Sequence, residues 1–212
     1  MNSNVEQIYY INLDKRTDRN EHIINNVLPW LNADENIIQR ISAVDTTHLS
    51  TSGLRATGCT LSHLKVFEDV LKNNYKYFIV IEDDFTPIIS SSEFEIRVNK
   101  LFTDFLDFDV CQIAYNEKCG GIVKKIDDIF MTGRNIQTAS GCIMNIDFCK
   151  KIKPVFEDSA KKLQEGGRYH TYACDQVWKP YQEFDRWLLT RCGKQLMGFS
   201  DIEGKSVNYR GK

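Results

Sequence analysis

The chain has 212 residues, of which 42% are hydrophobic and 26% are charged, and its formal net charge is −2. This composition is that of a soluble globular protein with a full core, and the near-neutral charge excludes a general affinity for nucleic acids or membranes. No apolar run is long enough for a transmembrane segment, and no signal peptide follows Met1. We therefore expect a cytoplasmic protein, in a bacterium or in the cytosol of a virus-infected host.

The seven cysteines are odd in number and include no C-x-x-C pair. Several lie in apolar segments, so we expect reduced and mostly buried thiols. A disulfide framework is not expected, although Cys142 and Cys149 could be bridged in principle. Binding of a metal ion by thiolates is not expected either.

The first predicted strand covers residues 5–13, and a polar loop follows it. A helix is predicted to begin at Thr17 or Asp18, either of which can cap it. Its buried stripe is predicted at Ile23, Ile24, Val27, Leu28 and Leu31.

The loop before this helix carries cationic residues where a dinucleotide-binding fold carries glycines. Side chains would then meet a phosphate group in place of backbone N–H groups. For Arg16 and Arg19 this role and a solvated helix start are equally compatible with the pattern, whereas the solvated position is favoured for Lys15.

The next two elements also bring polar residues to their ends. A strand predicted at residues 37–44 runs into Asp45, which could accept hydrogen bonds from a ribose or a base, or could be an ordinary turn residue. A helix is predicted to open at Gly58, with Ser62 and His63 in its first turn. Small residues at a helix N-terminus let an anion approach, although a single histidine there is more often a cap or a packing residue.

The central strand is predicted at residues 77–81, an unbroken apolar run that ends in Glu82, Asp83 and Asp84. Ligands of open α/β sheets bind beyond the carboxyl ends of the strands. Three adjacent carboxylates would repel each other without a cation, and Mg²⁺ or Mn²⁺ prefers oxygen ligands shared with substrate phosphates. The triplet therefore suggests a site for a metal ion and a phosphate, although a solvated acidic junction fits the triplet alone equally well.

The second half of the chain is less regular. It is predicted to form a helix, a strand, a hairpin or loop, another strand, a helix and two late strands, at residues 93–105, 109–115, 120–134, 137–146, 147–156, 187–189 and 195–197. Asp147 is predicted to cap the last helix and Pro154 to interrupt it. Asp175 is either a helix N-cap or a carboxylate presented to a cleft. Because strands and helices alternate and no linker is present, we predict one α/β domain over residues 1–212, with a mainly parallel central sheet flanked by helices.

Several of these motifs occur together in one order. They are YINLDKRTDR at 10–19, GCTLSH at 58–63, IEDD at 81–84, DQ at 175–176 and SDI at 200–202. In combination they resemble glycosyltransferase family 25, which includes bacterial lipooligosaccharide galactosyltransferases and collagen hydroxylysine galactosyltransferases. The resemblance implies a GT-A-like fold and an inverting transfer of galactose or glucose, assisted by Mn²⁺ or Mg²⁺. The donor would be a UDP-hexose and the acceptor a hydroxyl group of a glycan or a protein. Residues of about 1–115 would form the half that binds the nucleotide-sugar, and those of about 116–212 the acceptor half.

The resemblance also implies roles for individual residues. Glu82 and Asp84 would hold the metal, and the third protein ligand would be His170 or Asp201, or else water and phosphate would complete the shell. Asp175 would be the general base that an inverting displacement requires. The donor would be bound by Asn12, Arg16, Arg19, Asp45, Ser62, His63 and Asp83. The main alternative is a module of similar fold that binds a nucleotide-sugar or glycan without turnover. A receiver domain and a nucleotidyltransferase fit less well, because the acidic cluster follows the third strand and residues 14–19 contain no glycine.

Overall fold

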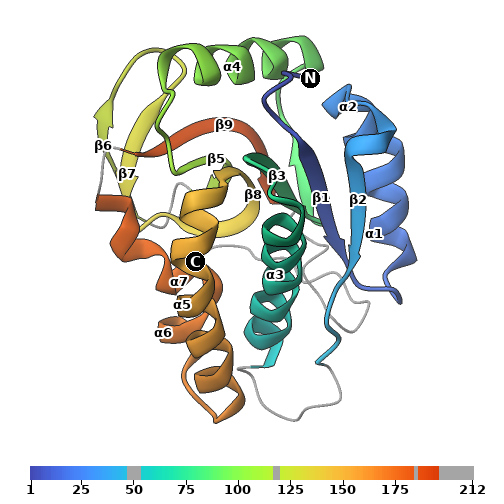
Figure 1. The fold of residues 1–212 in the computed structure, drawn as a ribbon, viewed down its shortest axis with the longest axis vertical. Coiled ribbons are helices and arrows are strands. Elements are labelled where there is room, and N and C mark those ends of the chain that lie inside the picture. Colours follow the sequence, from blue (N-terminus) through green and yellow to red (C-terminus); the bar gives the residue numbers. More distant parts are fainter. Residues whose placement is uncertain (47–53, 117–119, 184–185, 196–212) are drawn as a thin grey trace.

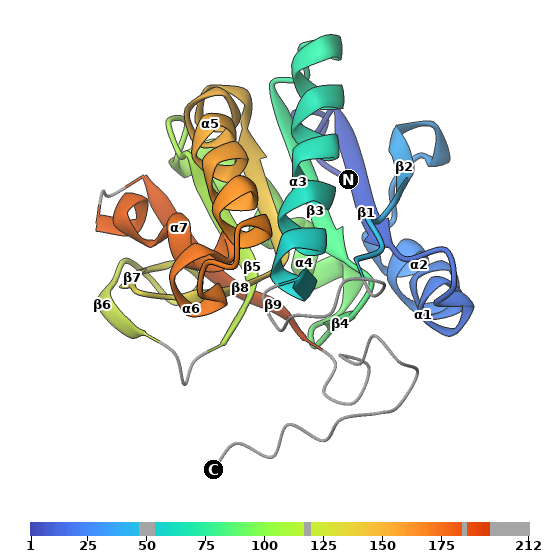
Figure 2. The same ribbon diagram turned by 90° about the horizontal axis from the view of Figure 1, so that it is seen from below.

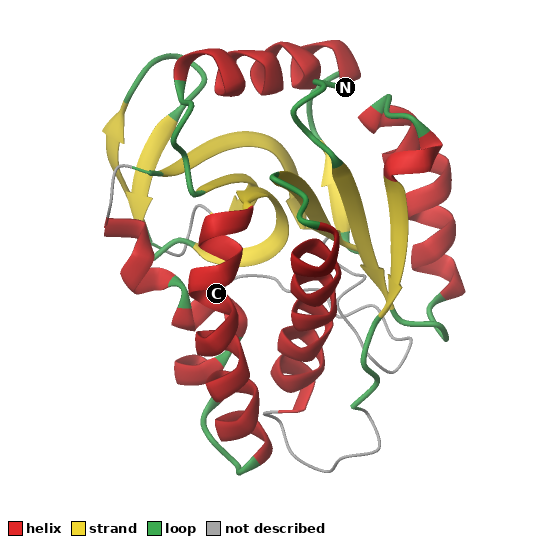
Figure 3. Cartoon of the chain, viewed as in Figure 1, coloured by secondary structure: helices red, strands yellow, loops and turns green. Residues whose placement is uncertain are grey.

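The computed structural model describes residues 1–46, 54–116, 120–183 and 186–195 (Figure 1). Within these ranges one nine-stranded sheet has the order β2-β1-β3-β8-β5-β9-β7-β6, and β4 pairs with β9 off that path. The strands are β1 (Gln7–Asn12), β2 (Ile38–Ser42), β3 (Tyr77–Glu82), β4 (Phe85–Pro87), β5 (Val110–Asn116), β6 (Gly121–Lys125), β7 (Met131–Arg134), β8 (Gln137–Asn145) and β9 (Trp187–Gln195). The predicted α/β class, with a central sheet and flanking helices, is confirmed (Figure 3).

The sheet is mixed in direction. β1 lies parallel to β2 on one side and to β3 on the other, as predicted. β8, however, runs antiparallel between β3 and β5, and β4 and β7 run antiparallel to β9. The predicted parallel arrangement therefore applies mainly to the half of the sheet in which the acidic triplet lies.

The core consists of two clusters, one on each face of the sheet. Side chains of a strand alternate between its two faces, so in β1 Tyr9 and Ile11 join one cluster while Ile8 and Tyr10 join the other. The first cluster also contains residues of α3 (Leu54–Asn73) and α5 (Ile146–Gln164), two helices that pack side by side (Figure 2). The second contains residues of the first helical segment and of α4 (Ser91–Asp104). The sheet is thus covered on both faces. Among the described residues no helix combines the length and the apolar character needed to cross a membrane.

The first helical segment differs from its prediction. It consists of α1 (Thr17–His22), a wider π-helical turn (Ile23–Val27) and α2 (Leu28–Leu31). The wide turn lies just before Pro29, which has no N–H to donate to the preceding turn. Neither Thr17 nor Asp18 is the N-cap: that position is Arg16, and its side chain makes no capping hydrogen bond. Ile24 is 45% exposed and does not belong to the buried stripe.

Three further boundaries also differ. α3 begins at Leu54, four residues before Gly58. α5 is capped by Asn145, whose side chain accepts a hydrogen bond from the Phe148 N–H, and it continues through Pro154 without interruption. Strong apolar packing on one face holds the helix to the sheet across the proline. The first late strand is longer than predicted and forms β9, whereas the second, predicted at 195–197, lies outside the described residues beyond Gln195. The remaining helices are α6 (Tyr169–Tyr172), α7 (Cys174–Val177) and 3-10 turns at Glu35–Ile37 and Lys179–Glu183.

Candidate functional site

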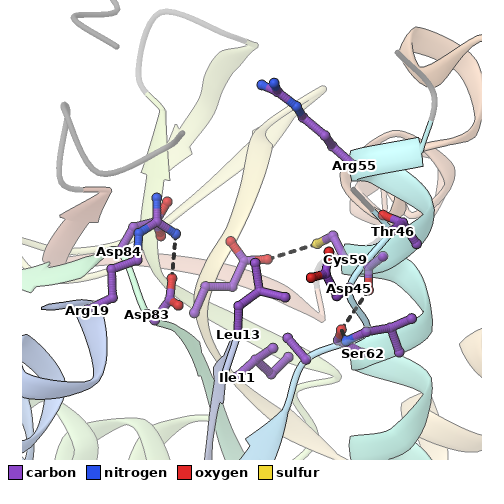
Figure 4. A pocket seen from close by; sticks show the side chains of 14 residues that line it. Ile11, Leu13, Arg19, Asp45, Thr46, Arg55, Cys59, Ser62, Asp83 and Asp84 are labelled. Carbon is purple, nitrogen blue, oxygen red and sulfur yellow. Dashed lines mark hydrogen bonds and ion pairs between the residues drawn. The ribbon is translucent and has the colours of Figure 1, made fainter. Parts of the chain in front are cut away.

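The three consecutive carboxylates accept hydrogen bonds from four different elements. β3 ends at Glu82, and Asp83 and Asp84 form the turn that leads into β4. Glu82 accepts hydrogen bonds from α3, Asp83 from α1 and β1, and Asp84 from β9. Figure 4 shows the contact between Arg19 and Asp83. The three side chains therefore have different protein partners, although all three line one pocket.

Asp83 has its own counterion inside the protein. Arg19 Nη1 lies 2.6 Å from Asp83 Oδ1, and both side chains are about nine-tenths buried. Asn12 Nδ2 donates to the other oxygen, Oδ2, at 2.8 Å. The Asn12 amide oxygen in turn accepts from Arg40. Asn12 thus fixes Asp83 beneath the surface of the site.

Only one of the two carboxylate oxygens of Asp84 has a hydrogen-bond donor among the residues that the structure describes. Its Oδ2 accepts a hydrogen bond from Gln195 Nε2 at 2.7 Å. Its Oδ1 is buried and has no hydrogen-bond partner in the described part of the chain. Burial and the nearby charge of Glu82 raise the pKa of Asp84 to about 7. A buried carboxylate oxygen without a hydrogen-bond donor is suited to bind a cation. A cation would offset both the cost of burying the charge and its repulsion by Glu82.

Glu82 has a different environment. Burial pushes its pKa upward, but hydrogen bonds from His63 and Cys59 outweigh burial, so that the net pKa is below the ordinary value. Both bonds reach the same oxygen, Oε1, at 3.1 Å. Glu82 therefore stays ionised next to Asp84.

Two nitrogens of the Arg19 guanidinium group lack hydrogen-bond acceptors among the described residues. Its Nε and Nη2 are buried and, within the described ranges, have no hydrogen-bond acceptor. The same side chain lines an open pocket together with Asp83 and Asp84, with about 630 Å³ of empty space. An anion in that pocket would satisfy the free guanidinium donors.

The opposite wall of the pocket is built by α3 and by the loop after β2. Ser62 Oγ donates to the Gly58 carbonyl at 2.6 Å and accepts from the Val44 N–H at 2.9 Å, so it binds the loop to the helix. Gly58 is required by this contact, since a Cβ there would lie 2.6 Å from Val44 O. Asp45 lines the pocket and pairs with Lys15 at 2.8 Å.

The predicted site residues fall into two groups. Those that line the pocket are Arg19, Asp45, Ser62, Glu82, Asp83 and Asp84. Asn12, Arg16 and His63 are buried next to it and are not among its described lining residues: Arg16 pairs with Asp18, and His63 with Glu82.

The remaining predicted residues come from the second half of the chain. Asp175 is in the first turn of α7, where Oδ2 accepts from the Thr138 N–H at 3.2 Å and Oδ1 from Gln176 Nε2 at 3.1 Å. His170 is exposed on α6, next to the ring of Tyr169, and is not among the described lining residues. Asp201 lies outside the described residues.

Sequence reasoning missed some pocket residues. Arg55, Thr46 and Cys59 line the pocket, and Gln195 holds Asp84. Arg55 and Cys59 are one turn apart on α3, a spacing that would have identified them had the helix been predicted to begin four residues earlier. No local signal links Gln195 to Asp84, because 111 residues separate them.

Among solved structures, a glycosyltransferase involved in the glycosylation of the major capsid of PBCV-1 is similar to this chain. The identity is 8% and the TM-score is 0.51, over 87% of this chain and 80% of the other. A197 from STIV has 13% identity and a TM-score of 0.46, over 89% and 83% of the two chains. A UDP-glucose pyrophosphorylase complexed with UDP-glucose has 11% identity and a TM-score of 0.46, over 90% and 92%. At these identities the first likeness shows the fold alone, a GT-A-like α/β domain.

The comparisons of sequence agree with the motifs. No curated protein matches the chain. The sequence profile described as glycosyltransferase family 25 (LPS biosynthesis protein) matches residues 5–126, more than half of the chain, and includes β1, α3, β3 and the acidic triplet. This protein therefore belongs to glycosyltransferase family 25.

Proposed function

We propose that this glycosyltransferase is a metal-dependent, inverting hexosyltransferase that moves galactose or glucose from a UDP-sugar to a hydroxyl group of a glycan or a hydroxylysine-type acceptor. The observation that carries the proposal is that, in the described part of the chain, hydrogen-bond donors and an acceptor of residues lining one pocket both lack partners. Arg19 Nε and Nη2 have no acceptor, and Asp84 Oδ1 has no donor, among the described residues. A diphosphate with a divalent cation would satisfy both.

Asp84, with Glu82, is the proposed holder of Mn²⁺ or Mg²⁺. When bound there, such an ion supplies Lewis-acid stabilisation of the negative charge that grows on the departing UDP. Both carboxylates line the pocket, and Glu82 remains ionised because His63 and Cys59 donate to it. His170 and Asp201 remain proposals for a third ligand, with water and phosphate as the other possibility.

The donor is proposed to lie between α1 and α3. Arg19 would hold the diphosphate through its two guanidinium nitrogens that lack acceptors in the described structure. The buried Arg16, which is not among the described lining residues, would add positive electrostatic potential. Asp45 would contact the uridine, and Ser62 would close the pocket by fixing the loop that carries Asp45. Asn12, Asp83 and His63 would act through the residues they position.

Asp175 is proposed as the general base that removes the proton of the acceptor hydroxyl. An inverting displacement needs this group on the face opposite the leaving group. The preceding residue, Cys174, reaches Cys59 of the pocket wall with 3.5 Å between sulfurs, which supports a place for Asp175 at the edge of the donor pocket. Residues of about 1–115 would thus form the donor half and those of about 116–212 the acceptor half. We also propose a cytoplasmic location, supported by the free thiols of the six described cysteines.

The experiment is a thermal-shift titration with UDP, UDP-galactose and UDP-glucose, each with and without Mn²⁺. At a hundredfold excess over Kd, binding to the native state adds about 2.7 kcal/mol, or roughly 5–10 °C for a chain of this size. We expect a Mn²⁺-dependent shift that Asp84→Ala abolishes and that Asp128→Ala, on the exposed side of the β6–β7 hairpin, leaves unchanged.

The outcomes separate the two candidate functions. No shift with any nucleotide would reject the donor site. A shift without hydrolysis of the donor or transfer to any acceptor in a screen of hydroxyl compounds would support the non-catalytic binding module instead.

A further inference from the structure

Four side chains with metal-binding atoms meet at the wall of the donor pocket, which Cys59 and Glu82 line. Cys59 and His63 lie one turn apart on the same face of α3, Glu82 ends β3, and Cys174 begins α7. Cys59 Sγ is 3.5 Å from Cys174 Sγ and 3.1 Å from Glu82 Oε1. His63 Nε2 is also 3.1 Å from Glu82 Oε1. The Cys59, His63 and Cys174 atoms all lie within 4.8 Å of one another.

Three of these separations are close to edges of a tetrahedral zinc site, and the group whose atoms all lie within 4.8 Å of one another consists of Cys59, His63 and Cys174. With Zn–S of about 2.3 Å and Zn–N or Zn–O of about 2.0 Å, a tetrahedron has edges of roughly 3.8 Å between two sulfurs, 3.5 Å between sulfur and oxygen, and 3.3 Å between nitrogen and oxygen. The three observed distances are shorter than these edges by no more than about 0.4 Å. Small side-chain rotations would therefore open the cluster around an ion.

Two of the four side chains are buried, and the histidine is oriented toward the cluster. His63 is 1% exposed and Cys174 is 3% exposed. The His63 ring packs between those of Phe67 and Phe156, with centroids 6.4 Å away in both cases. This packing keeps Nε2 directed at Glu82.

The kind of donor atoms selects the metal. Two thiolates, an imidazole and a carboxylate suit Zn²⁺, whereas Mg²⁺ and Mn²⁺ favour all-oxygen sites such as the one proposed at Asp84. Both thiols must lose their protons when the ion binds, so binding releases protons and weakens as the pH falls. Without metal, hydrogen bonds within the cluster satisfy the same atoms.

We propose that Cys59, His63, Cys174 and Glu82 Oε1 bind one structural Zn²⁺ that ties α7 to α3 and β3. The site shares Glu82 with the proposed donor metal site, but its other three ligands are not ligands of that metal, and Zn²⁺ binding can be tested without the proposed function. Its effect on the fold is to hold the start of α7, and hence Asp175, next to the pocket wall. It differs from the expectation from the sequence, in which no metal ion is bound by thiolates, because the two cysteines are 115 residues apart and form no C-x-x-C pair.

The test begins with the wild-type chain, purified under reducing conditions, stripped with a chelator and dialysed against Zn²⁺ with excess Mg²⁺. We expect one Zn²⁺ per chain by atomic emission. Replacement by Co²⁺ should give a thiolate-to-cobalt charge-transfer band and the intense d–d bands of a tetrahedral site. Cys59 and Cys174 should also become protected from alkylation when Zn²⁺ is added.

Variants then assign the ligands. Cys174→Ser and His63→Ala should each weaken Zn²⁺ binding at least tenfold. The control Cys149→Ala, which removes another buried thiol of the same core, should keep one Zn²⁺, and so should Asp84→Asn, which tests the donor metal separately. If Cys174→Ser fails to fold, the cobalt spectrum and the alkylation of the wild-type chain still show whether the two thiols bind the ion. Three outcomes would overturn the proposal: less than one Zn²⁺ per chain, a cobalt spectrum without thiolate bands, or a Cys59–Cys174 disulfide that forms instead of the metal site.

Discussion

Arg19 and Asp83 form a buried ion pair that joins the first helix to the turn after the central strand, with 2.6 Å between Nη1 and Oδ1. The pair uses one nitrogen of the guanidinium and leaves Nε and Nη2 with no acceptor among the described residues. Asp83 thus orients Arg19, and Arg19 keeps donors for an anion in the pocket. One acidic residue of the triplet therefore orients a cationic side chain of the same pocket.

Arg19→Met should destabilise the protein by about 3–5 kcal/mol, because it leaves the Asp83 carboxylate buried without a counterion. Urea unfolding measures the change. Adding Asp83→Asn in the same chain should recover much of the loss, since an amide costs far less to bury than an unpaired charge. The double variant should still fail to bind UDP, and recovery of UDP binding would contradict a role for Arg19 in holding the diphosphate.

Gly58→Ala should weaken both stability and UDP binding. The new Cβ would lie 2.6 Å from Val44 O and 2.8 Å from Thr46 Oγ1, so α3 and the loop after β2 must separate. We expect a cost of about 1–3 kcal/mol, together with a lower affinity for UDP. Gly121→Ala is the matched control, because a Cβ there meets nothing within 4 Å. Equal behaviour of the two variants in unfolding and titration would refute the close approach.

The elements that the sequence predicts well are those decided by local patterns. The apolar run at residues 77–81 and the change to carboxylates after it define β3 and the position of the site without any tertiary information. Pro154 shows the opposite case. Its local preference predicts a break, yet buried side chains on both sides of it, such as Ile152 and Phe156, hold α5 against the sheet and outweigh that preference.

The candidate site was predictable in its carboxylates and its cationic loop, but not in its internal pairing. Asp83 and Arg19 are 64 residues apart, and nothing in either segment indicates that one neutralises the other. The meeting of Cys59 with Cys174 depends on how α7 packs against α3, which is a property of the whole fold. Contacts of this kind follow from topology, whereas the residue types at strand ends follow from sequence.

Asp84→Asn should stabilise the metal-free protein, and more at about pH 8 than at about pH 5. The folded-state pKa of Asp84 is raised to about 7, so between its usual value of about 3.9 and 7 the native state holds a proton that the unfolded state has lost. Its contribution to stability therefore falls as the pH rises through this range. Urea unfolding with a chelator present measures the difference, and the exposed Asp128→Asn is the control.

Mn²⁺ extends this test. At about pH 8 the ion should restore stability to the wild-type chain and have little effect on Asp84→Asn, because only the carboxylate carries the charge that the ion neutralises. A Mn²⁺ effect of the same size in both chains would place the ion elsewhere. A stability difference between the two chains that does not change with pH would show that Asp84 is ionised throughout the range.

Asp175→Asn should separate binding from chemistry. The asparagine keeps an oxygen to accept the Thr138 N–H, so the start of α7 should keep its geometry. It cannot take the proton of an acceptor hydroxyl, and we expect kcat for transfer to fall by about 10²–10⁴ while the Kd for UDP with Mn²⁺ is unchanged. Asp147→Asn, at an exposed position in the first turn of α5, should change neither value. Unchanged kcat in Asp175→Asn would exclude Asp175 as the base, whereas a parallel loss of UDP binding would indicate that the residue supports the donor pocket instead.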